Sequence, residues 1–297
     1  MPIVDLDGIP TRYETVGEGP ALLMFSPGGF DSTLENWTTF GRYRDLGFVD
    51  ALSSAYTCVV FDRRESGRSG GRIERLTWDR YVAQAIGLMD HLALDRVHTM
   101  GGCVGCSTAA ALAVAAPERV RSMVLFSPAG GPQYRMGQHR RFTQHLAFVA
   151  EHGMQAVVDL ARSTTAGFSK DPRVGPWAAP LRTDDVFAAT FAATDPARYE
   201  HVVTGTVRGL FDRDTVPGVE PEDLMVLDVP ALIVPGQDSS HAPSAARYLE
   251  ECLPVHDYWD VPVVEQTPET APARILAFLD KHSLDEHSVD EHSLGQR

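Results

Sequence analysis

The chain has few cysteines, no long apolar run and too little positive charge to balance its acidic residues. Four cysteines in 297 residues are too few for a disulfide framework, so a hydrophobic core must hold the fold together. No segment approaches the roughly 18 consecutive apolar residues of a membrane-spanning helix. The formal net charge of −14 disfavours generic binding to nucleic acid or to anionic membranes, because both would repel the protein.

The N-terminal segment also lacks the basic stretch and the apolar stretch of a signal peptide. We therefore expect a soluble, cytoplasmic protein. The length and the 43% of hydrophobic residues suffice for one large domain, since α/β domains often reach about 200–250 residues. No metal or organic cofactor is implied, and the composition leaves the oligomeric state open.

Short apolar runs alternate with helical patterns along most of the chain. Strand-like runs lie at 21–25, 58–61, 98–100, 122–126, 231–234 and 256–261, and helical spacing lies at 78–92, 108–116 and 271–281. This alternation predicts an α/β fold with a mostly parallel sheet. Between 132 and 224 the strand-like runs disappear, while helical stretches occur at 141–160 and 184–193. That change predicts a helical cap inserted into the sheet domain.

The predicted organisation has three parts: a core of residues 1–131 and 225–281, a cap of residues 132–224, and a tail of residues 282–297. The tail repeats an acidic, polar five-residue unit that cannot bury enough area to fold, so we expect it to be disordered. Its repeated histidines are a less favoured metal-binding candidate. In the cap, Trp177 and the aromatics of Phe187–Phe191 are candidates to line an apolar pocket or to pack the cap against the core.

The most informative segment is Gly101-Gly-Cys-Val-Gly105, where a predicted strand runs towards a helix. Glycines two residues before and two after Cys103 allow a sharp turn in which Cβ atoms would clash. Such a turn holds the cysteine side chain above the sheet, at a helix N-terminus that favours the thiolate. The pattern predicts Cys103 as a nucleophile. The alternative is a small buried cysteine between packing glycines.

Together with other motifs, this segment makes the chain resemble the α/β-hydrolase family over roughly 21–279. Ser26-Pro-Gly-Gly-Phe30 looks like the family's oxyanion-hole loop, with proline where histidine is more usual. The segment Asp62–Ser69 is similar to the D-x-R-G-x-G-x-S turn, with Glu65 replacing one glycine, and Pro230–Asp238 looks like the strand and turn that end in the catalytic acid. The resemblance implies a three-layer α/β-hydrolase sandwich with a cysteine where most relatives carry serine.

The resemblance also implies roles for particular residues. Backbone N–H groups of Gly29 or Phe30, together with that of Val104 after the nucleophile, would stabilise a developing oxyanion. Asp238 takes the position of the catalytic acid. The turn at Asp62–Ser69 is expected to be structural.

The general base is less clear, because the stretch where the family places its histidine, Trp259–Thr270, contains none. Three interpretations stay open. His241, three residues after Asp238, serves as the base from its loop; or a cap histidine, His139 or His145, closes over the site. In the third, the thiolate acts without a histidine base, since a thiol is already a few per cent ionised at neutral pH.

The residues favour hydrolysis of a small ester, thioester or lactone by covalent catalysis through Cys103, with a small molecule as the only partner. The alternatives are a lyase, isomerase or acyltransferase on the same fold, and a non-catalytic binding protein, for which the missing histidine argues. Cys103-Val-Gly-Cys106 also matches the C-x-x-C of redox pairs, unless Cys106 merely fills a small-residue position behind the turn. No second Cys/His pair completes a zinc site.

Overall fold

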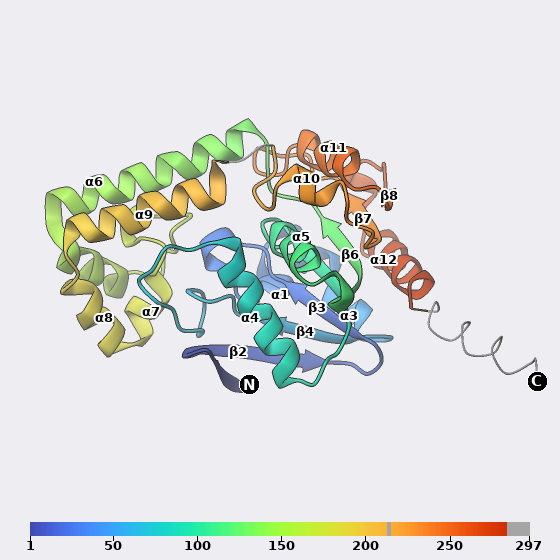
Figure 1. Ribbon diagram of the computed structural model, residues 1–297, viewed down its shortest axis with the longest axis horizontal. Coiled ribbons are helices and arrows are strands. Elements are labelled where there is room, and N and C mark those ends of the chain that lie inside the picture. Colours follow the sequence, from blue (N-terminus) through green and yellow to red (C-terminus); the bar gives the residue numbers. More distant parts are fainter. Residues whose placement is uncertain (213–214, 284–297) are drawn as a thin grey trace, which may run out of the picture.

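The computed structural model describes residues 1–212 and 215–283. Eight strands form one sheet in the order β1-β2-β4-β3-β5-β6-β7-β8. The first two strands pair antiparallel with their neighbours, and every pair from β4 to β8 is parallel. Helices flank this sheet, as Figure 1 shows. The predicted three-layer α/β fold with a mostly parallel sheet is confirmed.

The strands are β1 Ile3–Leu6, β2 Ile9–Val16, β3 Ala21–Phe25, β4 Thr57–Phe61, β5 Val97–Gly102, β6 Val120–Phe126, β7 Ala231–Val234 and β8 His256–Tyr258. The α-helices are α1 Asn36–Thr39, α2 Gly41–Leu46, α3 Phe48–Leu52, α4 Trp78–His91, α5 Gly105–Ala115, α6 Pro132–Ser163, α7 Ala178–Thr183, α8 Asp185–Ala192, α9 Pro196–Phe211, α10 Pro221–Leu224, α11 Pro243–Cys252 and α12 Thr270–Lys281. Short 3₁₀ helices lie at η1 Gly29–Asp31, η2 Pro117–Arg119, η3 Pro172–Val174 and η4 Val263–Glu265.

The central strands are buried along their whole length. Every residue of β5 and β7 is buried, and β6 has only one that is partly exposed. Strands covered by helices on both faces carry continuous apolar runs rather than alternating ones. This explains why the runs around 122–126 and 231–234 identify strands although they lack a polar face.

Some predicted boundaries are wrong for identifiable reasons. α5 begins at Gly105, directly after the turn at Cys103, rather than at 108. α6 begins at Pro132 rather than at 141, because proline fits the first helical turn, where no N–H partner is needed. β8 stops at Tyr258 instead of continuing to 261: the Trp259 N–H makes a last bond to the Ile233 carbonyl, and the Val261 N–H then turns to the Trp259 carbonyl.

Helices α6 to α9 form a lobe beside the sheet, between β6 and β7 in the sequence (Figure 1). Trp177 and Phe191 are fully buried there and pack against Tyr199, with ring centroids 5.7 and 5.0 Å away. These two aromatics therefore hold the lobe together, whereas Phe187 borders a cavity. We propose that this helical lobe acts as a cap. Of the predicted tail, residues 284–297 lie outside the described part of the chain.

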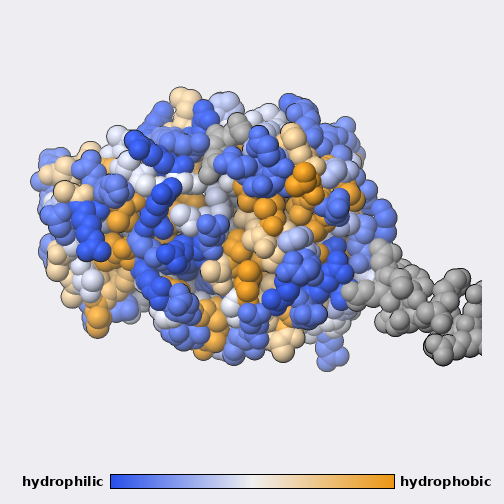
Figure 2. Space-filling model, viewed as in Figure 1, coloured by the Kyte–Doolittle hydropathy of each residue, from blue (hydrophilic) through white to orange (hydrophobic). Residues whose placement is uncertain are grey.

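The surface matches the acidic, polar composition. On the face shown in Figure 2, hydrophilic residues predominate, and the hydrophobic ones gather mainly near the middle of the view. Among the helices of residues 1–212 and 215–283, none combines the length and the apolar character that crossing a bilayer requires.

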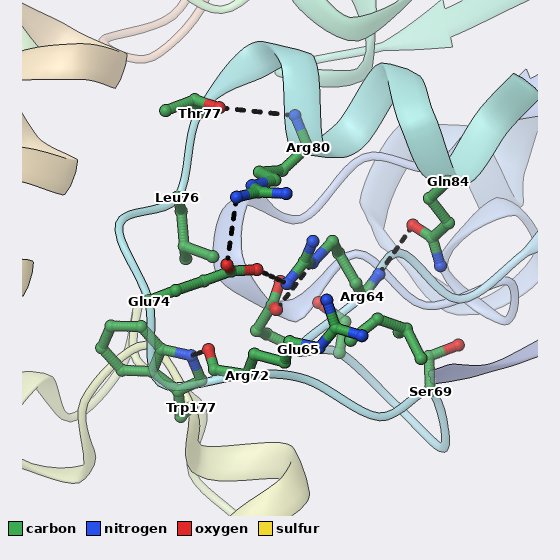
Figure 3. Close-up of polar contacts among 12 residues, drawn as sticks. Arg64, Glu65, Ser69, Arg72, Glu74, Leu76, Thr77, Arg80, Gln84 and Trp177 are labelled. Carbon is green, nitrogen blue, oxygen red and sulfur yellow. Dashed lines mark hydrogen bonds and ion pairs between the residues drawn. The ribbon is translucent and has the colours of Figure 1, made fainter. Parts of the chain in front are cut away.

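A buried ionic network occupies the turn after β4, where Glu65 stands in the left-handed region with φ of 65° (Figure 3). The Arg64 guanidinium donates to Glu65 over 2.8 Å and to Glu74 over 2.5 Å, and Arg80 contacts the far oxygen of Glu74. Burial raises the pKa of Glu65, against the opposing charge of Arg64. Arg64 is therefore the cation that compensates two carboxylates.

Replacing Arg64 should destabilise the fold strongly. Arg64→Gln removes the cation that is hydrogen-bonded to the buried Glu65 carboxylate and leaves only the charge of Arg63, at a cost of about 3 kcal/mol in the free energy of unfolding. The loss should shrink at acidic pH, because protonation then neutralises Glu65 in the variant. Arg44→Gln, which breaks the exposed Arg44–Asp45 pair, is the control and should change stability by less than about 0.5 kcal/mol. Urea unfolding measures both, and equal effects would contradict the assignment.

Candidate active site

Cys103 lies in a strained turn between β5 and α5. Its φ is 56°, in the left-handed region that non-glycine residues rarely adopt. Its backbone N–H donates to the Phe126 carbonyl, and its own carbonyl accepts from the N–H groups of Cys106 and Ala129. These bonds fix the turn from both neighbouring elements. Cys103 is therefore positioned by the sheet rather than by a free loop.

Two glycines make this turn possible. A Cβ on Gly105 would lie 2.2 Å from the Phe25 carbonyl oxygen, and a Cβ on Gly101 would lie 2.4 Å from the Cys106 nitrogen. Real Cβ atoms do not approach backbone atoms so closely, so no other residue fits without rearrangement. The same glycines that suggested a sharp turn in the sequence are thus required by the packing of α5 against β3.

Asp238 and His241 form a compact turn after β7. His241 Nδ1 lies 2.9 and 2.8 Å from the two carboxylate oxygens of Asp238, whose Oδ1 also accepts from the backbone N–H groups of Ser240 and His241. Partial burial opposes the charged form, but these hydrogen bonds outweigh it and lower the pKa of Asp238. The ionised carboxylate therefore fixes the orientation of the imidazole and leaves Nε2 to face the reacting atoms.

A short series of backbone hydrogen bonds connects this turn to Cys103. The Ala129 N–H donates to the Cys103 carbonyl over 3.2 Å, and the neighbouring Gly130 N–H donates to the Ser240 carbonyl over 3.0 Å. Gly130 and His241 also form a parallel bridge. The segment after β6 therefore lies between the histidine turn and the cysteine turn and is hydrogen-bonded to both.

The nearby Cys103 changes the pKa of the His241 ring. Burial opposes protonation of the ring, but attraction to Cys103 and then to Asp238 outweighs it and raises the pKa of His241 to about 9. His241 Nε2 is buried and has no partner of hydrogen-bonding geometry among the described residues. The contact is thus an electrostatic approach of thiol and ring rather than a formed hydrogen bond. Catalytic hydrogen bonds are often loose without substrate.

The oxyanion-loop residues lie in η1, next to the Cys103 turn. Within the described chain, no hydrogen bond joins the backbone N–H of Phe30 or of Val104 to another residue, while the Phe30 carbonyl accepts from Ser66. The Phe30 ring packs on Phe142 and Phe168, at centroid distances of 5.4 and 5.3 Å. The loop is therefore anchored against the helical lobe, and the Phe30 N–H of the loop and the Val104 N–H of the cysteine turn are both available.

Aromatic side chains of the lobe cover this region, and Cys103 is only 8% exposed. A cavity of about 320 Å³ lies between the start of α6 and Ser239–Ser240, beside the histidine turn. A cavity of about 390 Å³ between the loop at 71–73 and helices α8 and α9 contains none of the candidate catalytic residues. Access to Cys103 is thus expected from the α6 side.

The other histidine and cysteine candidates lie elsewhere. His139 pairs with Asp212 on the lobe surface, and His145 is buried inside the lobe with Nε2 2.6 Å from the Tyr199 hydroxyl. The Cys106 thiol is buried and donates to the Gly101 and Phe126 carbonyls. This placement favours Cys106 as a packing residue over a resolving thiol, because it faces away from solvent behind the turn.

No motif or spacing in the sequence points to Arg42 or Gln266. Arg42 donates to Ser127 Oγ over 3.1 Å and to Gln266 Oε1 over 2.7 Å, and its guanidinium lies over the Phe126 ring. Burial lowers the pKa of Arg42, whereas the charge of Asp238 opposes this shift. Gln266, in the stretch where the family histidine is usual, donates to the Pro235 carbonyl. Together they support the strand end that carries Asp238.

The fold thus combines a strand–turn–helix segment at Cys103, an Asp238–His241 pair after β7 and a helical lobe between β6 and β7. The model of the alpha/beta hydrolase fold family matches residues 21–169, half of the chain. The chain belongs to the alpha/beta hydrolase fold family. Within residues 1–212 and 215–283, no group of three His, Cys, Asp or Glu side chains could hold a metal ion.

Curated members of the family match part of this hydrolase-fold chain. It is 36% identical over 126 residues to the dihydrolipoyllysine-residue acetyltransferase component of the acetoin cleaving system of Cupriavidus necator, covering 42% of this chain and 31% of that protein. It is 33% identical over 128 residues to the 2-hydroxy-6-oxo-6-phenylhexa-2,4-dienoate hydrolase of Comamonas testosteroni, covering 42% of each. The matches thus span less than half the length of these relatives.

The solved structures extend the likeness along the chain. The enol-lactonase of Burkholderia xenovorans aligns with a TM-score of 0.60 at 21% identity, over 94% of this chain and all of that one. At this identity the agreement concerns the fold alone. It includes the region after residue 169, which the family model does not match.

Proposed function

We propose that this protein hydrolyses a small ester, thioester or lactone through an acyl intermediate on Cys103. The observation that carries the proposal is the Asp238–His241 pair, with contacts of 2.8 and 2.9 Å, held beside a cysteine whose φ is 56°. A nucleophile next to an oriented base is the arrangement that covalent catalysis requires. His241 thereby takes the role that no histidine in the stretch Trp259–Thr270 fills.

In the first half-reaction, the Cys103 thiolate attacks the substrate carbonyl carbon and His241 holds the thiol proton. The carbonyl oxygen becomes an oxyanion, which the backbone N–H groups of Val104 and of Phe30 or Gly29 stabilise. The carbon–oxygen or carbon–sulfur bond to the leaving group then breaks. The His241 imidazolium donates its proton to that leaving group, and an acyl thioester remains on Cys103.

In the second half-reaction, neutral His241 removes a proton from water, and the hydroxide attacks the thioester carbon. The carbon–sulfur bond breaks, and the carboxylic acid and the Cys103–His241 pair are regenerated. Asp238 stays ionised throughout, because its role is to fix the ring and to stabilise the imidazolium.

Acyl transfer is the second candidate, favoured by the match to an acetyltransferase component. The acyl-Cys103 intermediate is the same, and only the acceptor differs. Adding a small thiol or alcohol would divert the acyl group from water if transfer is the main reaction. Unchanged product acid at millimolar acceptor would favour hydrolysis.

The acyl intermediate can be trapped. Mixing the protein with 4-nitrophenyl pentanoate and quenching in acid should give a mass increase of one acyl group, which peptide mapping should place on Cys103. A burst of nitrophenol should precede steady turnover if hydrolysis of the thioester is slower than its formation. Turnover with the acyl group on another residue would overturn the nucleophile assignment, and a binding protein should show neither adduct nor turnover.

A further inference from the structure

The cavity beside the histidine turn is lined on one side by arginines of α6. It holds about 320 Å³, at the small end of the range for ligand sites, and its lining includes Tyr134, Arg140, Arg141, Ser239 and Ser240. Ser239 and Ser240 stand between Asp238 and His241 in the sequence. The cavity therefore lies beside the loop that carries the proposed acid and base.

The charge at this place differs from that of the whole protein. The chain carries a net charge of −14, yet the helical segment 132–150 contains three arginines and no acidic residue. No ion pair joins Arg140 or Arg141 to a carboxylate in the described part of the chain, and both line the cavity. Unpaired guanidinium groups in an acidic protein are suited to binding an anion.

The direction of the Arg141 side chain connects this charge to the nucleophile. Its Nη1 lies 3.7 Å from the place where a Cβ of Gly137 would stand, so the side chain runs back over Gly137 towards the helix start. Tyr134, one turn further, is buried and within electrostatic reach of both Arg141 and Cys103. An anion at Arg141 would thus share Tyr134 as a neighbour with the Cys103 turn.

We propose that Arg140 and Arg141 bind a carboxylate at the far end of the acyl group, so that the substrates are monoesters, thioesters or lactones of dicarboxylic acids. This inference rests on the proposed function, whose site it extends. The Ser239 and Ser240 side chains supply hydroxyl groups on the opposite wall of the cavity. A neutral acyl group of equal length fills the same space but leaves the arginines without a partner.

The test uses two substrates that differ only at the acyl terminus. The mono-4-nitrophenyl ester of glutaric acid carries a carboxylate where 4-nitrophenyl pentanoate carries a methyl group. The wild-type protein should favour the anionic ester in kcat/KM by about tenfold or more, as expected for a charge-assisted hydrogen bond. Arg141→Gln should remove this preference by lowering kcat/KM for the anionic ester about tenfold more than for the neutral ester, while Arg141→Lys should retain part of the preference.

Arg198→Gln is the matched control, since Arg198 is exposed on α9 and borders the larger cavity that lacks catalytic residues. It should keep the full preference. An equal loss for both esters in Arg141→Gln, or a loss in Arg198→Gln alone, would overturn the assignment of the arginine site.

Binding without turnover separates this inference from the proposed function. Glutarate should bind the Cys103→Ala protein in calorimetry, and adding Arg141→Gln should weaken that binding by about tenfold. If glutarate binds in an Arg141-dependent manner while neither ester acylates Cys103, the anion site stands and the hydrolase proposal fails. If acylation occurs but glutarate binding ignores Arg141, the proposed function stands and the anion site fails.

Discussion

Cys103→Ala should lower kcat by about 10⁴-fold or more, because no other group can form the acyl intermediate. The fold should tolerate the change, because alanine is smaller than cysteine. Both residues carry a Cβ atom, so the φ of 56° is similarly strained in the variant. The effect is measured as the rate of 4-nitrophenyl pentanoate hydrolysis, monitored by the release of nitrophenol. Cys103→Ser should keep more activity than alanine, since the His241–Asp238 pair remains to remove the hydroxyl proton.

Cys252→Ala serves as the control for this prediction. Cys252 is a buried thiol at the end of α11, so its removal tests the loss of a thiol as such. This variant should hydrolyse the ester at the wild-type rate. Near-normal turnover in Cys103→Ala, with thermal unfolding unchanged, would show that the reaction does not pass through this sulfur.

The second large effect is expected from His241→Asn, which should reduce kcat/KM by about 10²–10⁴-fold, the usual contribution of a general base. The rate at which iodoacetamide alkylates Cys103 should also change in this variant. A His241 pKa of about 9 means that below that pH the ring carries a positive charge beside Cys103, and this charge attracts the negative charge on an attacking sulfur. Reaction of Cys103 with iodoacetamide should therefore be slower in the variant than in the wild type below pH 9, and the difference should vanish above it.

Two internal references make this measurement specific. Cys58 should stay unmodified in both proteins, because burial raises its pKa to about 12. His139→Asn removes the lobe histidine that pairs with Asp212 and should leave both the rate and the pH profile unchanged. If His139→Asn were the damaging variant instead, the base would belong to the lobe.

The sheet and the Cys103 turn were predictable because their signals are local. Continuous apolar runs identify doubly covered strands, and the spacing of Gly101 and Gly105 around Cys103 encodes a turn that only small residues allow. Asp238 and His241 are also close in sequence, so their pairing was one of three open interpretations. The role that we propose for them still depends on the kinetic tests.

Long-range contacts were not predictable from one sequence. Arg42 is hydrogen-bonded to Ser127 and Gln266, which lie 85 and 224 positions further along the chain. The spacing of hydrophobic residues predicts strands and helices but not contacts between such distant residues. The start of α6 was missed because glycine and proline around 131–132 read as a loop, although proline also begins helices. The anion-binding face of α6 was missed with it.

The compact Asp238–His241 turn has a consequence for how the protein loses activity on heating. Asp238 and His241 share one loop at the end of β7, so no contact with the last described helix, α12, is needed to align them with each other. Fraying of α12, the last described helix, would leave the pair and its spacing from Cys103 intact. Heat inactivation should therefore follow the melting of the central strands, and trimming the chain beyond the last helix should cost little activity.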